Sequence, residues 1–261
     1  MGAPYRRTTA GPVLVGVDGS GTATAAVDLA AREAHARRVP LLLVHWYQGA
    51  TIRSRLAAGG AGSSLVELSR GASLVVVGAG GTEGFPGRRL GPEAEFVVAH
   101  AHAPVIVVRP ATASVGSSDP VIVGVDGSAS GQAALAFAFE EADARGAPVL
   151  PLFAWYRLPA SNLGPVRPLN YWPVEARAEA ARMLAEALAG KAEEYPDVRV
   201  RPIVLFDPQP AAVLIKTSRW AGLVVVGRRG RGRLAHRLVG SVSDALVGRA
   251  NCPVAVVGCP V

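Results

Sequence analysis

The sequence predicts an α/β fold in which two tandem units each carry a parallel β-sheet covered by helices. Short runs rich in valine, isoleucine and leucine alternate with alanine-rich helical segments, a pattern typical of parallel strands joined by crossover helices. The strand segments are apolar without interruption, as expected of a sheet that is covered on both faces. The same pattern of strands and helices also occurs twice along the 261 residues.

An internal duplication divides the chain into two halves. The motif VGVDGS places Asp18 and Asp126 at the same position, and a run LVVVG ends at Gly78 and again at Gly227. The matched segments are 13–20 with 121–128, 45–47 with 154–156, 74–78 with 223–227, and 103–108 with 252–257. We therefore predict a first domain over residues 1–113 and a second over residues 119–261, with the small, polar linker 111–118 between them.

The second half carries the full set of elements. A strand is expected at each run of β-branched residues and a helix at each alanine-rich, helical pattern between them. The expected order is strand 121–126, helix 130–145, strand 148–154, helix 174–194, strand 198–205, helix 209–219, strand 222–227, helix 241–249 and strand 253–257.

The first half lacks one helix–strand unit. The halves match at an offset of 109 positions at the second strand but of 149 positions at Gly78 and Gly227, so 40 residues are missing between these points. The missing piece corresponds to 174–205, and only a glycine- and serine-rich stretch, 57–64, stands in its place. In a doubly wound sheet of order 3-2-1-4-5 that strand is an edge, so the centre of the sheet is retained. The strand at 40–44 then becomes an exposed edge that is prone to aggregation.

A glycine loop in the second half predicts an anion-binding site. An apolar run ends at Gly227, Gly230 follows, and Gly240 closes the loop before a helical run that begins at Ser241. Glycines allow backbone N–H groups to approach a phosphate, and a helix start offers unpaired N–H donors. Positive charge beside the loop comes from Arg228, Arg229, Arg231 and Arg233. The loop therefore indicates a polyphosphate ligand, and the alternative is an ordinary strand-to-helix turn. Neither a lysine-containing P-loop nor a G-x-G-x-x-G fingerprint is present.

Composition narrows the class of protein. The net charge is +7, but no basic stripe with interleaved aromatic residues occurs, which argues against nucleic acid as a partner. No apolar run is long enough for a membrane span, and no signal segment is evident, so we expect a soluble, cytoplasmic protein. If the residues between Cys252 and Cys259 form a strand, the two thiols lie about 23 Å apart and cannot pair. His100 and His102 lack a cluster of further ligands, so no metal site is expected.

Three motifs together resemble a tandem universal stress protein. They are the strand-ending aspartate of VGVDGS, the G-x2-G-x9-G-[ST] loop, and the Cys-Pro-Val start of the last strand, and the resemblance covers roughly residues 12–109 and 120–258. It implies two Rossmann-like, five-stranded parallel sheets of order 3-2-1-4-5, the first without its edge unit. It also implies ATP as the ligand, because many members of that family bind ATP, with Mg²⁺ carried by the nucleotide.

The resemblance assigns a complete ATP site to the second half. Asp126 falls where the family's acid bonds the ribose, and Ala154 falls where backbone groups read the adenine. The implied ATP-binding residues are Gly124, Val125, Asp126, Ala154, Val226, Gly227, Gly230, Gly240, Ser241, Val242 and Ser243. For three of these the alternative is a helix cap, namely Asp126 for the helix that follows it, and Ser241 and Ser243 for their own helix.

The corresponding site of the first half is degenerate. Pro92 replaces the serine at the helix start and removes one N–H group. Glu93 and Glu95 add negative charge at a helix N-terminus where a phosphate would otherwise lie. The residues that keep the pattern are Asp18, Gly78, Gly81 and Gly91. We expect this half to bind ATP weakly or not at all.

These features together predict a nucleotide-dependent switch in stress response or signalling, in which ATP orders the loop 227–240 and biases a surface for an unidentified protein partner. The segment 155–173 is either a lid over the nucleotide or a packed surface loop. The last strands, 103–108 and 253–257, should meet across a pseudo-twofold axis, which makes the chain an internal dimer and leaves a homodimer open. The alternatives are a scaffold that binds no nucleotide, or a slow ATPase.

Overall fold

A computed structural model describes residues 11–45, 60–80, 90–109, 119–155, 174–230 and 239–259. The first half contains β1 (Val13–Val17), α1 (Gly21–Arg37), β2 (Leu41–His45), α2 (Ala61–Leu68), η1 (Ser69–Gly71), β3 (Leu74–Gly78), α3 (Pro92–His100) and β4 (Val105–Val108). The second half contains β5 (Val121–Gly124), α4 (Ala129–Arg145), β6 (Val149–Trp155), α5 (Val174–Leu188), α6 (Lys191–Glu194), β7 (Ile203–Phe206), α7 (Pro210–Thr217), η3 (Ser218–Trp220), β8 (Leu223–Gly227), α8 (Ser241–Arg249) and β9 (Val254–Val257).

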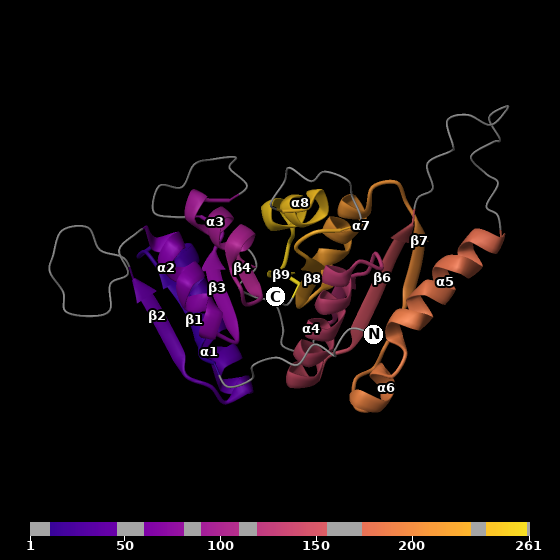
Figure 1. Ribbon diagram of the computed structural model, residues 1–261, viewed down its shortest axis with the longest axis horizontal. Helices are drawn as coiled ribbons and strands as arrows, with labels where there is room; N and C mark the ends of the chain where they lie inside the picture. The colour runs from indigo at the N-terminus through magenta and orange to yellow at the C-terminus, as the bar shows by residue number, and fades with distance from the viewer. Residues whose placement is uncertain are drawn as a thin grey trace, which may run out of the picture.

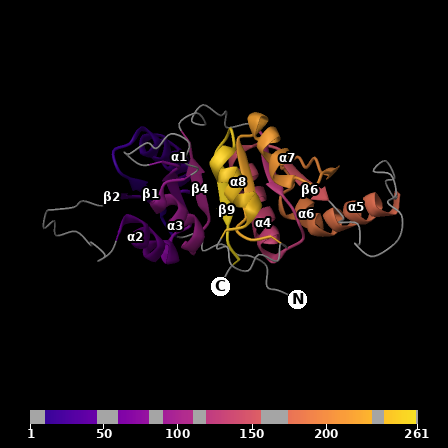
Figure 2. The same cartoon turned by 90° about the horizontal axis from the view of Figure 1, so that it is seen from above.

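The described strands form one continuous sheet in the order β2-β1-β3-β4-β9-β8-β5-β6-β7 (Figure 1). All pairs within each half are parallel, whereas β4 and β9 are antiparallel, with Ile106 opposite Ala255. The second half thus has the expected order 3-2-1-4-5, and the first has the same order without its edge strand. The expected pairing of the two last strands is also found, and it joins the halves at the centre of the molecule (Figure 2).

The unit that the first half lacks is α5, α6 and β7. Helices α2 and α7 are counterparts, because Leu65 and Leu214 pack in the same way against Gly16 and Gly124, at 3.1 and 3.2 Å from an ideal Cβ atom. Part of the glycine- and serine-rich stretch at 57–64 therefore belongs to a helix, since α2 begins at Ala61. The sequence does not indicate this helix, because its first turn consists of small residues. The large apolar residues of α2 begin only in its second turn.

Two expected boundaries in the second half and one expected match between the halves were wrong. The single helix expected at 174–194 is split into α5 and α6, because Gly190 adopts a left-handed conformation with φ of 77°. The strand expected from residue 198 begins at Ile203, and Val200 forms only an isolated bridge to Val149. Strand register also makes His45 the counterpart of Phe153 rather than of Ala154, because Gly16 pairs with Val44 where Gly124 pairs with Leu152.

Apolar side chains fill both faces of the sheet, and each face has its own set of helices. Buried residues of α1, α4 and α5 pack on one face, and those of α2, α3, α7 and α8 pack on the other. Valines of the central strands, such as Val76 and Val225, are fully buried, which explains why the strands carry no polar alternation. Within the described residues, no helix combines the length and the apolar character that crossing a bilayer requires.

Helices α1 and α4 meet at the junction of the halves through four charged side chains. Arg37 contacts Glu33 on its own helix and Glu141 on α4, and Arg145 contacts Glu141 on its own helix and Glu33 on α1. All four side chains are at most 13% exposed. Burial alone would raise the pKa of Glu33, but Arg37 and Arg145 outweigh burial, so this pKa lies below its ordinary value.

Candidate functional site

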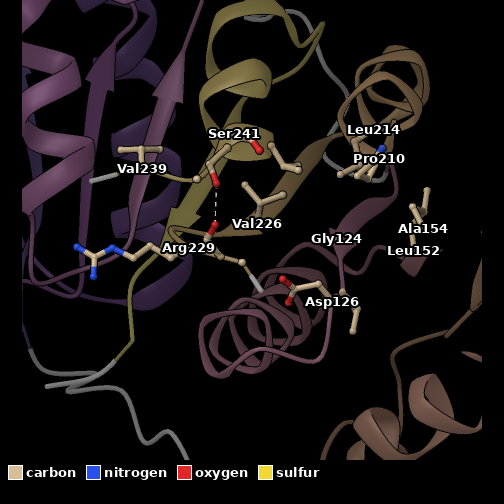
Figure 3. A pocket seen from close by; sticks show the side chains of 16 residues that line it. Gly124, Asp126, Leu152, Ala154, Pro210, Leu214, Val226, Arg229, Val239 and Ser241 are labelled. Atoms are coloured by element: carbon tan, nitrogen blue, oxygen red, sulfur yellow. Dashed lines mark hydrogen bonds between the residues drawn. The ribbon is translucent and has the colours of Figure 1, made fainter. Parts of the chain in front are cut away.

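A pocket of about 480 Å³ opens at the carboxyl ends of β5, β6 and β8, between helices α7 and α8 (Figure 3). Strands β5 and β8 are neighbours, but the chain leaves them toward opposite sides of the sheet. Open α/β sheets bind ligands at such a switch point, because the loops diverge there and leave a crevice. The pocket lining is Gly124, Val125, Asp126, Leu152, Ala154, Pro210, Leu214, Val226, Gly227, Arg229, Gly230, Val239, Gly240, Ser241, Val242 and Ser243.

The lining contains all eleven residues that the sequence assigned to the second-half site. The residues that the assignment missed are Leu152, Pro210, Leu214, Arg229 and Val239. Of these, Leu152 is two residues before Ala154 on β6, so it shares a face with that residue, and this spacing was the one available signal. Pro210 and Leu214 belong to α7, and the sequence carries no motif that brings this helix to the pocket.

One side of the pocket is apolar. Leu152 and Ala154 of β6 lie beside Pro210 and Leu214 of α7, and Val226 of β8 continues the same wall (Figure 3). Leu152 and Leu214 are almost fully buried, so they form a fixed surface beneath the opening. A flat apolar group fits such a wall better than a charged one does.

The start of helix α8 faces the pocket without a side-chain cap. Its N-cap is Gly240, which has no side chain to accept from the first turn, whereas Ser20 and Ser128 cap helices α1 and α4 in that way. The glycine loop is closed by the N–H of Gly240, which donates to the carbonyl of Arg228 at 2.8 Å. A helix start of this kind presents backbone donors and a positive dipole end to an anion.

The two serines of this helix start differ in what they offer. The Ser243 hydroxyl donates to the carbonyl of Gly227 at 2.7 Å, and the residue is 2% exposed. The hydroxyl therefore anchors α8 to the end of β8, while Ser243 still lines the pocket. Ser241 is exposed at the pocket mouth.

Asp126 follows β5 and is half-buried at the pocket. Its Oδ1 accepts from the Ser128 N–H at 2.9 Å and from the Ser128 hydroxyl at 2.6 Å. Ser128 in turn accepts from the N–H of Gly131 at 3.0 Å and is the N-cap of α4. The alternative in which Asp126 itself caps this helix is therefore wrong, because Ser128 has that role.

The arginines near the glycine loop do not all face the pocket. The Arg228 guanidinium donates to the carbonyl of Ala101, just after α3 in the first half, and lies against the backbone of Gly258. Burial lowers the pKa of Arg228, and the neighbouring charge of Arg229 lowers it further. Arg229 does line the pocket, but its guanidinium points away from Asp126 toward the first half (Figure 3). Arg228 therefore does not direct its positive charge at the pocket, contrary to expectation. Arg231 and Arg233 lie outside the described residues.

The first half retains the backbone frame of the site. The N–H of Gly91 donates to the carbonyl of Ala79 at 2.9 Å, which repeats the closure made by Gly240. Gly78 lies so close to Thr22 that a Cβ atom would approach its hydroxyl to 2.8 Å, as Gly227 lies against Ser130. Asp18 is exposed and accepts from the Ser20 N–H at 2.9 Å. Gly81 lies outside the described residues.

A carboxylate from the first turn of α3 caps the neighbouring helix α2 in the first half. Glu93 accepts from the N–H of Gly62, in the first turn of α2. Helix α2 has Gly60 as its N-cap and no other side-chain cap. Glu93 stands at the position of Val242, which lines the pocket of the second half. The negative charge expected at α3 is thus present, but it serves the neighbouring helix α2.

The described histidines and cysteines lie outside the pocket lining. Among the described residues, no group of three or more His, Cys, Asp or Glu is placed to hold a metal ion, and His100 Nδ1 lies 2.9 Å from the carbonyl of Phe96. Cys252 is buried and Cys259 is exposed, and both are free thiols. Burial raises the pKa of Cys252 to about 12, so this thiol is unreactive. The segment at 156–173 and His236 lie outside the described residues.

Comparison with known proteins identifies the family of this chain. The profile of the universal stress protein family matches residues 50–109 and 118–258. Universal stress protein Rv2623 of Mycobacterium tuberculosis is 35% identical over 94% of this chain and 95% of its own length. Universal stress protein Rv2005c of the same organism is 34% identical over 94% of this chain and 96% of its own length.

A solved structure shows the same fold at lower sequence similarity. The crystal structure of a universal stress protein from Archaeoglobus fulgidus superposes with a TM-score of 0.63 and 17% identity. The match covers 95% of this chain and 98% of that chain, so it includes both halves. From its duplicated sheet, its family profile and its full-length relatives, the chain belongs to the universal stress protein family as a tandem member.

Proposed function

We propose that the second half binds an adenine nucleotide, ATP, and that this binding makes the protein a nucleotide-dependent switch in stress response or signalling. The observation that supports the proposal is the pocket itself. It combines an apolar wall, a carboxylate and an uncapped helix start within about 480 Å³. Pockets of this size and composition are suited to a ligand of nucleotide size.

Each part of the nucleotide has a complementary part of the pocket. The adenine ring lies against Leu152 and Leu214, with backbone groups at Ala154 in reach of its edge. Asp126 accepts hydrogen bonds from the ribose hydroxyls, because an ionised carboxylate is an acceptor only. The phosphates approach Gly240 and the first turn of α8, where the absence of a side-chain cap leaves backbone donors for an anion. Any Mg²⁺ arrives with the nucleotide, since no acidic cluster occurs among the described residues.

The link from the pocket to the rest of the protein passes through Arg228. Its carbonyl accepts from Gly240 and closes the glycine loop, while its side chain donates to Ala101 of the first half. A nucleotide that orders this loop therefore also biases the junction of the halves, which lies beside the paired strands β4 and β9. We propose that the junction, in the cytoplasm, is where an unidentified protein partner distinguishes the two states.

Isothermal titration calorimetry of the full chain with ATP tests the proposal. We expect one nucleotide per chain, because Pro92 removes one N–H group from the start of α3 and Glu93 adds a negative charge to its first turn. Replacement of Asp126 by asparagine should weaken binding by about tenfold or more, as expected for a bond to a charged group. The matched variant Asp18→Asn should bind as the wild type does.

Two outcomes would contradict the proposal. The first is no heat of ATP binding together with no nucleotide released when the purified protein is denatured, which would favour a scaffold. The second is an equal loss in the Asp18 and Asp126 variants. Release of inorganic phosphate is to be measured in the same samples. Sustained release that Asp126→Ala abolishes would identify an ATPase instead of a switch.

A further inference from the structure

The carboxylate of Asp126 lies between two glycines. A Cβ atom on Gly131, in the first turn of α4, would lie 2.6 Å from Oδ1. A Cβ atom on Gly230, in the glycine loop, would lie 2.6 Å from Oδ2. Real Cβ atoms do not approach an oxygen so closely, so either side chain would displace the carboxylate.

The backbone of Gly131 gives no other reason for a glycine. The residue is helical and buried, and it is not among the residues with positive φ. Alanine is the better helix former at such a position, since glycine loses more backbone entropy on folding. The feature that excludes a side chain at Gly131 is therefore its contact with Asp126 and with the Ser128 hydroxyl, which a Cβ atom would approach to 3.2 Å.

The first half shows the same turn with a side chain present. Ala23 stands where the second half has Gly131, three residues after the capping serine in both halves. The Ser20 hydroxyl lies 2.8 Å from Thr22 Oγ1, whereas the Ser128 hydroxyl donates to Asp126. Asp18 is exposed, whereas Asp126 is half-buried. Both aspartates accept from the N–H of the capping serine at 2.9 Å, but only Asp126 also accepts from its hydroxyl.

We propose that Gly131 is a positioning residue that directs the Asp126 carboxylate into the pocket, and that Ala23 is one reason why the first half does not recognise a ribose. This inference rests on the proposed nucleotide binding and adds a cause of its ribose selectivity. Gly131 acts through Asp126, because its own contribution is the space in which the carboxylate lies.

The test compares ATP with 2′,3′-dideoxy-ATP, which lacks both ribose hydroxyls, by calorimetry on the full chain. In the wild type, ATP should bind about tenfold or more tightly than the dideoxy compound. In Gly131→Ala, affinity for ATP should fall to that for the dideoxy compound, while affinity for the dideoxy compound stays unchanged. The adjacent, exposed Gln132→Ala should retain the wild-type ratio.

A purely structural role would produce a different result. If Gly131→Ala weakens both ligands equally, or binds ATP as the wild type does, the inference is wrong although the proposed function stands. If the wild type binds neither ligand, the proposed function itself fails. If Gly131→Ala does not fold, a crystal structure of the Ala23→Gly variant tests the inference in the first half instead. We expect the Ser20 hydroxyl to turn from Thr22 to Asp18, and an unchanged Asp18 would overturn the inference.

Discussion

Arg145 of α4 lies 2.6 Å from Glu33 of α1, across the junction between the two halves. The reverse contact, from Arg37 of α1 to Glu141 of α4, completes a symmetric group of four charges. Both pairs of equivalent residues are 108 positions apart, as are Asp18 and Asp126, so the group lies on the pseudo-twofold axis of the duplication. The junction therefore combines a strand pair with a closed set of buried ion pairs.

Removal of one charge from this group should destabilise the protein strongly. Glu141→Gln leaves Arg37 and Arg145 buried without one of their carboxylates, and breaking a buried ion pair costs about 3–5 kcal/mol. Urea denaturation followed by circular dichroism measures this loss. The control is Glu186→Gln, in an ion pair with Arg182 whose side chains are 60–61% exposed, and it should change the free energy by less than about 1 kcal/mol. Equal effects of the two variants would show that the buried group has no special weight.

The same group should make stability depend on pH in the acid range. The pKa of Glu33 is lowered from 4.5, so its ionised form stabilises the folded state fully above that pH. This contribution is lost as the pH falls below 4.5 through the folded-state pKa. The difference in unfolding free energy between the wild type and Glu33→Gln should therefore narrow below pH 4.5. A difference that stays constant down to pH 3 would contradict the pKa shift.

Glu93 should stabilise the first half without affecting the second. Replacement by alanine removes the acceptor of the Gly62 N–H, which should lower the unfolding free energy by about 0.5–1 kcal/mol, as for a lost helix cap. ATP binding by the second half should be unchanged in the same variant. Glu95→Ala, an exposed residue of the same turn, is the matched control. The appearance of a second ATP per chain in Glu93→Ala would show that this carboxylate alone closes the first site.

Arg228 should hold the end of α3 against the second half. In Arg228→Met the carbonyl of Ala101 loses a charged donor, so amide exchange in the last turn of α3 should become faster. Hydrogen–deuterium exchange with mass spectrometry resolves this segment from the rest of the sheet. Arg249→Met, at an exposed position in α8, should leave the exchange unchanged. Faster exchange throughout both variants would indicate general destabilisation instead of a lost contact.

The edge strand β2 should determine solubility. Leu43 is 54% exposed there, while its counterpart Pro151 is buried in the second half, where β7 adds the next strand. Leu43→Lys places a charge on this edge strand and should therefore reduce aggregation. Light scattering measured as the protein is concentrated should be lower than for the wild type, with little change in melting temperature. Leu68→Lys, a comparable exposed leucine on α2, tests the effect of exposure away from the edge. If both variants reduce scattering equally, the edge has no special role.

Repetition in the sequence predicts the sheet well, because matched strands and the offset between them are properties of the chain itself. The two matching halves and the missing edge unit follow from it, whereas the strand order 3-2-1-4-5 is what the resemblance to the family implies. The glycine loop and the helix start at the pocket are also predictable from the residues, whereas the rest of the assigned lining comes from the resemblance to the family. Periodicity does not reveal the break at Gly190, because an isolated glycine is usually tolerated within a helix.

Contacts between distant segments are the part that the sequence does not reveal. Glu93 accepts a hydrogen bond from Gly62 in α2, and Arg228 donates one to Ala101 after α3. In both cases the two residues are far apart in the sequence. The direction of a long side chain depends on which neighbour offers an acceptor, and that neighbour is known only once the halves are joined. The Glu33 and Arg37 spacing recurs at Glu141 and Arg145, so an overlay of the two halves could have indicated the charge group.

The antiparallel contact of β4 with β9 gives this protein an assembly that cannot dissociate on dilution. Two separate subunits would dissociate at low protein concentration. The two halves of this chain are covalently linked, so each has a high effective concentration for the other. A substitution in a symmetric dimer alters both copies at once, but here each half can change by itself. The first half can therefore carry Pro92 and Glu93 where the second half has Ser241 and Val242, and it still supplies the strand that pairs with β9.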